Sequence, residues 1–290
     1  MSRRRVVIHA DDLGMSHGAN AAFAELSALG TCSAGSAMVP CPWFADIAAR
    51  ARADASLDIG VHLTLTSEMP GYRWRPLTRP PASSGLTDDQ GFFHRDTATV
   101  RMRADREAVR AELEAQIDAA LDAGIDVTHL DDHMGAVLAP EFVDVAVEIA
   151  CQRSLPLLLC PSLLDYGGTH NLIGADNSVF RRAVARAVSL GQPVFDRIVE
   201  TDWDRSESVG PAYQVIFDRL GEGVSFLALH FAIPGEIENI DPVGHQIRTD
   251  EYALFESAAF RDFLAGTGIE ICGMREYRDG MRQQGELTVT

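Results

Sequence analysis

Acidic and imidazole side chains stand at the ends of four short apolar runs in this sequence. They are Asp11 with Asp12, His62, the segment 129–133 (His-Leu-Asp-Asp-His) and His230. Carboxylates and imidazoles are ligands of divalent cations, and a carboxylate beside such a cation can take a proton from water. Because four apolar runs end in such groups, the sequence predicts a hydrolytic metal site.

The apolar runs have the length and composition of β-strands, and helical patterns separate them. We expect strands at 5–9, 33–39, 57–62, 126–130, 155–160, 194–199, 225–230 and 269–272, and helices at 20–29, 44–52, 100–123, 141–153, 179–190, 213–220 and 251–264. This alternation indicates right-handed βαβ units and a parallel sheet. The 290 residues therefore predict an α/β fold, a single-domain TIM-like (β/α) barrel, seven-stranded or irregular, whose strand ends share one mouth.

One stretch, residues 67–99, shows no clear period and is rich in proline and aromatic residues. A long loop in a compact domain is usually functional or disordered. We interpret it as a lid or substrate wall inserted in the single domain 1–290. Its Tyr72, Trp74 and Phe92 suit the apolar face of a sugar ring.

Each polar residue also has a purely structural interpretation. Asp11 or Asp12 could cap the next helix, and His62 or His230 could be a neutral histidine in a packed interior. Asp132 could be a solvated loop charge. Because all these groups stand at strand ends, a shared metal site explains them better than separate structural roles do.

His129, Asp131 and His133 alternate, which would place them on one face of an extended strand. The chain is expected to turn into a loop there, so the three need not all be ligands. We expect His129 and Asp131 to support the site from behind the ligands.

Charge and composition exclude several classes of protein. The chain has 25 basic and 42 acidic residues, a net charge of −17, which argues against nucleic-acid binding. It contains no lysine, which excludes Schiff-base chemistry and a P-loop. No apolar window approaches the ~18 residues of a membrane span. With five scattered cysteines and no secretory pattern, we expect a cytoplasmic protein without a membrane partner.

Three motifs resemble those of the YdjC-like carbohydrate deacetylases, a family that includes deacetylases of chitooligosaccharides. They are residues 11–14 (Asp-Asp-Leu-Gly), 60–66 (Gly-Val-His-Leu-Thr-Leu-Thr) and 128–133 (Thr-His-Leu-Asp-Asp-His). Weaker similarity at 229–230, 250–252 and 269–272 extends the resemblance over essentially the whole chain.

The resemblance implies a variant (β/α) barrel that holds one divalent metal through one Asp and two His. Carried onto this sequence, the ligands are Asp12, His62 and His133, and Asp11 is the catalytic base. His230 falls where the family has a histidine near the catalytic centre. The donor set suits Zn or Mg first and leaves Mn, Co and Ni open.

The sequence departs from the family pattern at three positions. Gly135 stands where many members have a histidine after the third ligand, and His9 stands where asparagine is common. The triplet 230–232 is His-Phe-Ala in place of His-Pro-Gly. None of these changes removes an expected ligand, and all three lie on the expected substrate side.

Together these features predict a metal-dependent hydrolase that removes acetyl groups from N-acetylated sugars or oligosaccharides. Asp11 would act as the base, and His230 would give a proton to the leaving amine. Two alternatives stay open: a metal hydrolase of another amide or of a phosphoester, and a catalytically inactive carbohydrate-binding barrel. The expected partner is a small carbohydrate, and the sequence leaves open whether the chain forms a homodimer.

Overall fold

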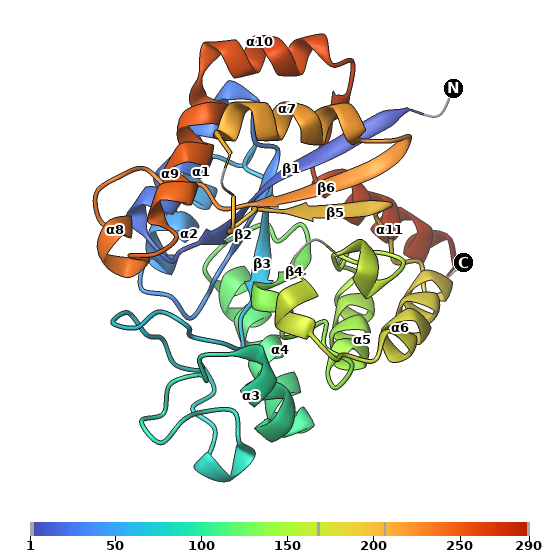
Figure 1. Cartoon of the computed structure of the whole chain (residues 1–290). Coiled ribbons are helices and arrows are strands. Elements are labelled where there is room, and N and C mark those ends of the chain that lie inside the picture. The colour runs from blue at the N-terminus through green and yellow to red at the C-terminus, as the bar shows by residue number, and fades with distance from the viewer. Residues whose placement is uncertain (1–2, 167–168, 206, 289–290) are drawn as a thin grey trace.

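A computed structural model describes residues 3–166, 169–205 and 207–288. Within these residues seven parallel strands form one sheet. Six of them lie in the order β4-β3-β2-β1-β6-β5 (Figure 1), and β7 pairs with the beginning of β1. The strands are β1 Arg4–Leu13, β2 Ala34–Ala37, β3 Ile59–Leu63, β4 Leu130–Asp132, β5 Arg197–Glu200, β6 Gly223–Leu229 and β7 Glu270–Ile271.

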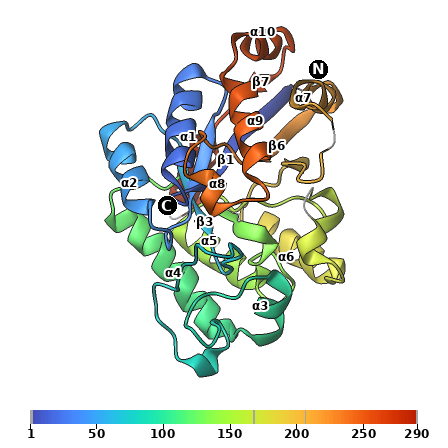
Figure 2. The ribbon, with the colours of Figure 1, turned by 60° about the vertical axis from the view of Figure 1, so that its left-hand side comes forward.

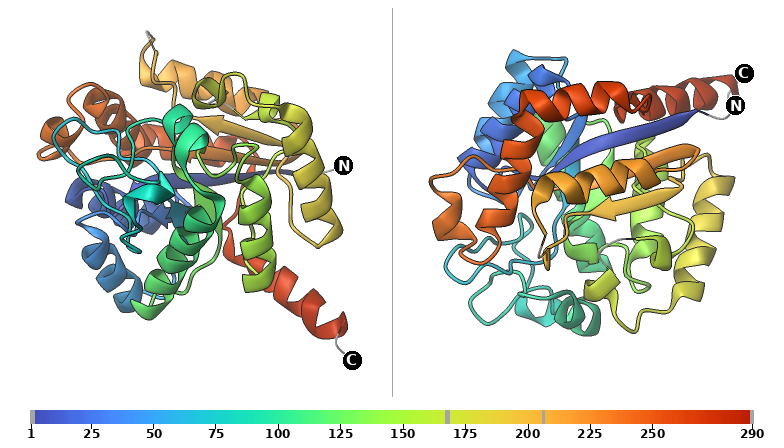
Figure 3. Two further views of the ribbon diagram at one scale, coloured as in Figure 1. Left: turned by 90° about the horizontal axis from the view of Figure 1, so that it is seen from below. Right: turned by 45° about the horizontal axis from the view of Figure 1, so that its top comes forward.

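Helices alternate with the strands and flank the curled sheet (Figure 2). They are α1 His17–Leu29, α2 Phe44–Ala53, α3 Thr97–Arg103, α4 Arg106–Asp122, α5 Val143–Arg153, α6 Asn177–Ser189, α7 Val209–Arg219, α8 Ile237–Ile240, α9 His245–Glu256, α10 Ala258–Gly266 and α11 Arg275–Thr288, with 3-10 turns at Ala82–Ser84, His133–Gly135, Leu163–Asp165 and Thr169–Leu172. Helix α11 projects from the body of the molecule (Figure 3). Over the described ranges, no helix has both the length and the apolar character needed to cross a bilayer.

Strand β1 is the centre of the sheet and of the core. Its Val6, Val7 and Ile8 are fully buried, and its two edges pair with β6 on one side and with β2 and β7 on the other. Burying an aliphatic side chain of this kind stabilises the fold by roughly 1.5–3 kcal/mol. Gly60 of β3 lies so close to its neighbour that a Cβ there would meet the main-chain oxygen of His129 at 2.6 Å. The sheet is therefore tightly packed at β1 and also beside β3, between Gly60 and His129.

The expected parallel α/β sheet is confirmed, whereas closure into a TIM-like barrel is not shown. In the described residues, the sheet is open and curled, and its pairing path ends at β4 on one side and at β5 on the other. The expected strand 155–160 is not a strand: it makes an isolated bridge between Leu157 and Leu130. Pro156 supplies the physical reason, because proline has no N–H to donate to a strand ladder.

Two of the expected helices are each two helices. The pattern over 100–123 breaks at Asp105, whose carboxylate accepts two N–H groups of the first turn of α4. The pattern over 251–264 breaks at Ser257, whose hydroxyl oxygen caps α10 in the same way. Asp and Ser favour such positions because their side-chain oxygens satisfy free N–H groups at a helix start.

The stretch 67–99 forms an irregular lobe beside α3 and α4 (Figure 1). Glu112 of α4 is fully buried and anchors this lobe by accepting the N–H groups of Leu77 and Thr78, each at 3.0 Å. The lobe is thus tied to the core by hydrogen bonds to a buried carboxylate.

Candidate metal centre and active site

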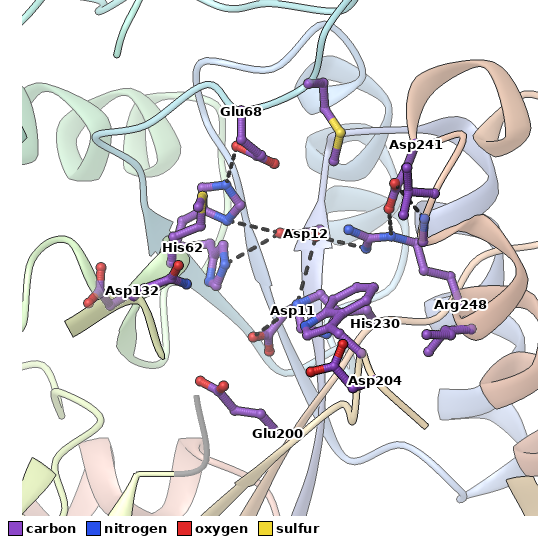
Figure 4. A pocket seen from close by; sticks show the side chains of 18 of the residues that line it. Asp11, Asp12, His62, Glu68, Asp132, Glu200, Asp204, His230, Asp241 and Arg248 are labelled. Carbon is purple, nitrogen blue, oxygen red and sulfur yellow. Dashed lines mark hydrogen bonds and ion pairs between the residues drawn. The ribbon is translucent and has the colours of Figure 1, made fainter. Parts of the chain in front are cut away.

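A β-bulge near the end of β1 turns two consecutive carboxylates toward one cavity. Successive side chains of a regular strand point to opposite faces, but the register of β1 against β2 shifts between Ala10 and Leu13. Asp12 there adopts the left-handed conformation, with φ of 61°, which aspartate tolerates better than most residues. Asp11 and Asp12 therefore both line the cavity (Figure 4).

The three residues implied as metal ligands meet at one point. One donor atom each from Asp12, His62 and His133 lies within 4.8 Å of the other two. Asp12 Oδ1 is 3.5 Å from His62 Nε2 and 3.3 Å from His133 Nδ1. These residues come from the ends of β1 and β3 and from the turn that follows β4.

The state of Asp12 Oδ1 shows that these residues fit a divalent cation. This oxygen is buried and has no hydrogen-bond partner, although two imidazole nitrogens lie within 3.5 Å of it. Leaving a buried acceptor unpaired costs about 1–3 kcal/mol. Ligands of a tetrahedral ion with bonds near 2.0–2.1 Å are separated by about 3.3–3.4 Å. The observed distances match that separation, and one oxygen with two imidazoles is a donor set that Zn and related ions accept.

Each imidazole turns its outer nitrogen to a carboxylate. His62 Nδ1 lies 2.9 Å from Asp131 Oδ2, and His133 Nε2 lies 3.0 Å from Glu68 Oε2. Ser36 Oγ donates to the same Asp131 oxygen at 2.8 Å. Such carboxylate–histidine pairs orient metal ligands and fix their tautomers. Asp131 thus lies behind His62, one of the three expected ligands.

The same carboxylates shift the pKa of both histidines. Burial acts to lower the pKa of His62, but Asp131 and Asp12 hold it well above its usual value. Burial likewise acts to lower the pKa of His133, whereas Glu68 and Asp12 raise it to about 9. Binding a cation here must therefore displace protons from the imidazoles.

The second oxygen of Asp12 is held by a buried arginine. Arg248 donates from Nη1 to Asp12 Oδ2 at 2.8 Å and from Nε to Asp241 Oδ2 at 2.9 Å. Burial acts to raise the pKa of Asp12, but the Arg248 charge, with help from the two histidines, holds it well below its usual range. Asp12 is therefore an ionised carboxylate with one oxygen fixed and one available.

A chain of buried side chains stands behind Asp11. His9 Nδ1 donates to Asp11 Oδ1 at 2.6 Å, and His9 Nε2 lies 2.8 Å from His129 Nε2. His129 in turn contacts Thr128 Oγ1 through Nδ1 at 2.9 Å. Burial and the neighbouring His9 lower the pKa of His129 to about 3, so that ring is neutral. This series of hydrogen-bonded side chains fixes Asp11 Oδ1, whereas Asp11 Oδ2 faces the cavity.

The structure excludes two of the simpler interpretations, the cap of α1 by Asp11 or Asp12 and a solvated Asp132. The cap of α1 is Ser16, not Asp11 or Asp12. Asp132 is not a solvated loop charge, because it is 5% exposed and accepts the N–H groups of Val137 and Leu138. Burial raises the pKa of Asp132 to about 7.

His230 faces Asp11 and Asp12 from the end of β6. Its Nε2 lies 3.9 Å from Asp11 Oδ2 and 3.9 Å from Asp12 Oδ2. The Trp203 ring packs against it with a centroid distance of 4.7 Å. Burial lowers the pKa of His230 to about 4, although both aspartates act to raise it. His230 is thus a neutral imidazole at neutral pH.

The cavity itself has a volume of about 460 Å³, a size usual for small-molecule sites. Seven carboxylates and a single guanidinium line it, with Trp203 and aliphatic side chains as its apolar part (Figure 4). The carboxylates are Asp11, Asp12, Glu68, Asp132, Glu200, Asp204 and Asp241.

The aromatic residues proposed from the sequence as a sugar platform do not line this cavity. Tyr72 and Trp74 donate to main-chain carbonyls of the core, and Phe92 lies beneath two arginine side chains. Trp74 is buried, whereas Tyr72 and Phe92 are partly exposed outside the cavity lining. Trp203 is the aromatic residue among those that line the cavity.

Sequence reasoning missed several residues of the site. Glu200 directly follows the expected strand 194–199, so the strand-end pattern could have identified it. Glu68 and Trp203 lie in irregular segments, and Arg248 lies within a helix, where sequence spacing gives no signal. These residues reach the site only through the tertiary fold.

The sequence of this chain is similar to a known protein family and to curated relatives. The family model described as YdjC-like protein matches residues 5–266. A carbohydrate deacetylase of Thermus thermophilus is 40% identical over 157 residues, which are 54% of this chain and 54% of that protein. One of Thermoanaerobacter pseudethanolicus is 28% identical over 156 residues, 54% of this chain and 60% of that protein. The matched part thus spans little more than half the length of these curated relatives.

A solved structure from Enterococcus faecalis V583, described as a cellobiose-phosphate cleavage protein, is similar in fold. Its TM-score is 0.76 at 22% identity, and the match covers 95% of this chain and 99% of that chain. At this identity the likeness shows the fold alone.

The metal centre generates a first prediction. His62→Asn and His133→Asn each remove one donor, so metal affinity should fall by more than the ~10–100-fold that outer contacts are worth. Metal content after dialysis against a fixed free concentration measures this. His94→Asn is the matched control, because His94 is a buried histidine that bonds the Gly85 carbonyl outside the cavity. Metal binding by both ligand variants at the strength of the control would contradict the site.

Glu200 generates a second prediction, on stability against pH. Burial and the charge of Asp11 raise the pKa of Glu200 from 4.5 to about 7. Between these values the folded chain binds a proton that the unfolded chain has lost, so its free energy of unfolding falls as pH rises, by on the order of 1–3 kcal/mol. Glu200→Gln removes this loss.

Denaturant unfolding with a chelator present tests this. The stability of Glu200→Gln relative to the unmodified chain should grow from about pH 4.5 to about pH 7 and stay constant above. A difference that does not change with pH would show that Glu200 is solvated.

Proposed function

This chain belongs to the family of YdjC-like proteins, and on that premise we propose that it is a divalent-metal-dependent hydrolase that removes acetyl groups from N-acetylated sugars or oligosaccharides. The observation that carries the proposal is the unpartnered Asp12 Oδ1, which lies between His62 and His133 at the spacing of ligands around one ion. The deacetylase names of the relatives support the substrate class.

Asp12, His62 and His133 would hold the ion, with Zn or Mg as first candidates. Such an ion polarises an amide carbonyl and lowers the pKa of bound water. Asp12, His62 and His133 all line the cavity, so water and substrate in the cavity would have access to an ion held by these three residues.

Asp11 is the proposed base. Its Oδ1 is held by His9 and its Oδ2 faces His230, so Asp11 can take the proton of a water that attacks the acetyl carbon. Hydrolysis forms the bond from this water oxygen to the carbon and breaks the C–N bond. The leaving nitrogen needs one proton, and neutral His230 can receive it at Nε2 from Asp11 and pass it on.

The cavity lining supports a sugar as the other partner. Trp203 contributes apolar ring surface to the wall next to His230, with Arg248 lying over the ring at 4.9 Å, and the C–H groups of a sugar ring pack well on aromatic surface. Seven carboxylates against one guanidinium disfavour the alternative of a phosphoester, because like charges repel strongly in a partly buried cavity.

The presence of Asp11 together with all three proposed ligands also disfavours the alternative of an inactive carbohydrate-binding barrel.

An assay of acetate release from a panel of N-acetylated sugars, with and without chelator, tests the proposal. We expect release that stops when the ion is removed and returns when it is added back. Release that persists with a chelator that has stripped the metal would contradict metal dependence, and no release from any member would contradict the substrate class.

Asp11→Asn provides the third prediction. The amide cannot take a proton, so turnover should fall on the order of 10²–10⁴-fold, the range for a lost general base. Metal content should stay at the level of the unmodified chain, because Asp11 is not one of the three proposed ligands. Full turnover with bound metal would return Asp11 to a structural role.

A further inference from the structure

Helix α9 carries a buried carboxylate, Glu251, directly behind His230. Glu251 is 0% exposed, and a buried charge is costly unless hydrogen bonds satisfy it. Three donors converge on it: the Tyr213 hydroxyl, the Thr201 hydroxyl at 3.0 Å and the main-chain N–H of His230 at 3.0 Å. Neither Glu251 nor Thr201 lines the cavity, so neither can touch a substrate there.

The direction of these bonds determines which nitrogen of His230 carries hydrogen. Thr201 Oγ1 has one hydrogen, which it donates to Glu251, and it lies 2.9 Å from His230 Nδ1. Toward the ring the hydroxyl can therefore only accept, so Nδ1 must be the N–H. A neutral imidazole has a single N–H, which leaves Nε2 bare, facing Asp11 and Asp12.

The hydrogen on His230 Nδ1 requires that Glu251 is ionised and accepts from Thr201. Burial raises the pKa of Glu251 to about 7, while the three donors act to lower it. Above that pH the carboxylate can only accept, and the order of donation from His230 through Thr201 to Glu251 is fixed. The Trp203 ring also contacts the His230 ring, with a centroid distance of 4.7 Å and an interplanar angle of 58°, so packing and the hydrogen bond at Nδ1 both hold the ring.

We propose that Thr201 and Glu251 are positioning residues for the deacetylation, which fix the tautomer and orientation of His230. This inference rests on the proposed function. With Nε2 bare, the ring can receive there the proton that Asp11 has taken from water and release it to the leaving nitrogen. With the hydrogen on Nε2 in the resting state, no proton from Asp11 could be received at that atom.

The test compares Thr201→Val, which removes the hydroxyl at constant shape, with Thr201→Ser, which keeps it. ¹⁵N NMR of the metal-free full-length protein, about one pH unit above the pKa of Glu251, reports which imidazole nitrogen of His230 carries hydrogen. His230→Gln identifies the signal among the nine histidines. Tyr213→Phe is the matched control, because it removes another donor to Glu251 and should leave the hydrogen on Nδ1.

We expect the hydrogen on Nδ1 in the unmodified chain and in Thr201→Ser, and a shift toward Nε2 in Thr201→Val. In the metal-loaded enzyme, Thr201→Val should lower kcat about 10–100-fold, the usual effect of losing an outer support. KM and metal content should stay unchanged, and Thr201→Ser should restore most of kcat.

Two results would overturn the proposal: a hydrogen on Nε2 in the unmodified chain, or a Thr201→Val variant with unchanged tautomer and unchanged kcat. Thr201→Ala gives the same two readouts if the valine variant does not fold. If no N-acetylated sugar releases acetate, the proposed function fails, yet the NMR result still decides whether Thr201 and Glu251 position His230.

Discussion

The rest of the site depends on the different environments of the two carboxylate oxygens of Asp12. Arg248 holds Oδ2 at 2.8 Å, whereas Oδ1 has no hydrogen-bond partner and lies between two imidazole nitrogens. This arrangement exists because β1 bulges at its carboxyl end and Asp12 takes the left-handed conformation. The buried residues 6–13 of the central strand β1 supply the packing energy that supports such strain.

Around Asp12, the site consists of histidine–carboxylate pairs. Each imidazole that faces Asp12 has a carboxylate on its outer nitrogen, Asp131 for His62 and Glu68 for His133. The supports come from different parts of the chain: Asp131 from the central sheet and Glu68 from the irregular lobe. The lobe therefore does more than cover the cavity, because it fixes the orientation of one proposed ligand. On the other side of the cavity, helix α9 supports the third proposed ligand, because its Arg248 donates to Asp12.

The strand-end residues could be predicted from the sequence because one rule brings them together: parallel strands point their carboxyl ends at one edge of the sheet. Asp12 and His62 follow from that rule. Arg248 and Trp203 do not, because their place in the site depends on how α9 and an irregular segment fold back over the sheet. Hydrophobic periodicity also misjudged the segment 155–160, where Pro156 interrupts strand pairing. Closure of the expected TIM-like barrel, seven-stranded or irregular, is not shown, because the sheet is open and curled in the described residues. Aromatic content alone could not tell that Trp74 is buried, or that Tyr72 and Phe92 contact a main-chain carbonyl and two arginine side chains instead of lining the cavity.

Anomalous diffraction from crystals grown with zinc or manganese would test the central claim most directly, because it locates the ion without reference to activity. The account predicts one strong peak within about 2.0–2.2 Å of Asp12 Oδ1, His62 Nε2 and His133 Nδ1, with Arg248 still on Asp12 Oδ2. A fully loaded crystal whose peak lies on other residues, or one without a peak between these three atoms, would contradict it.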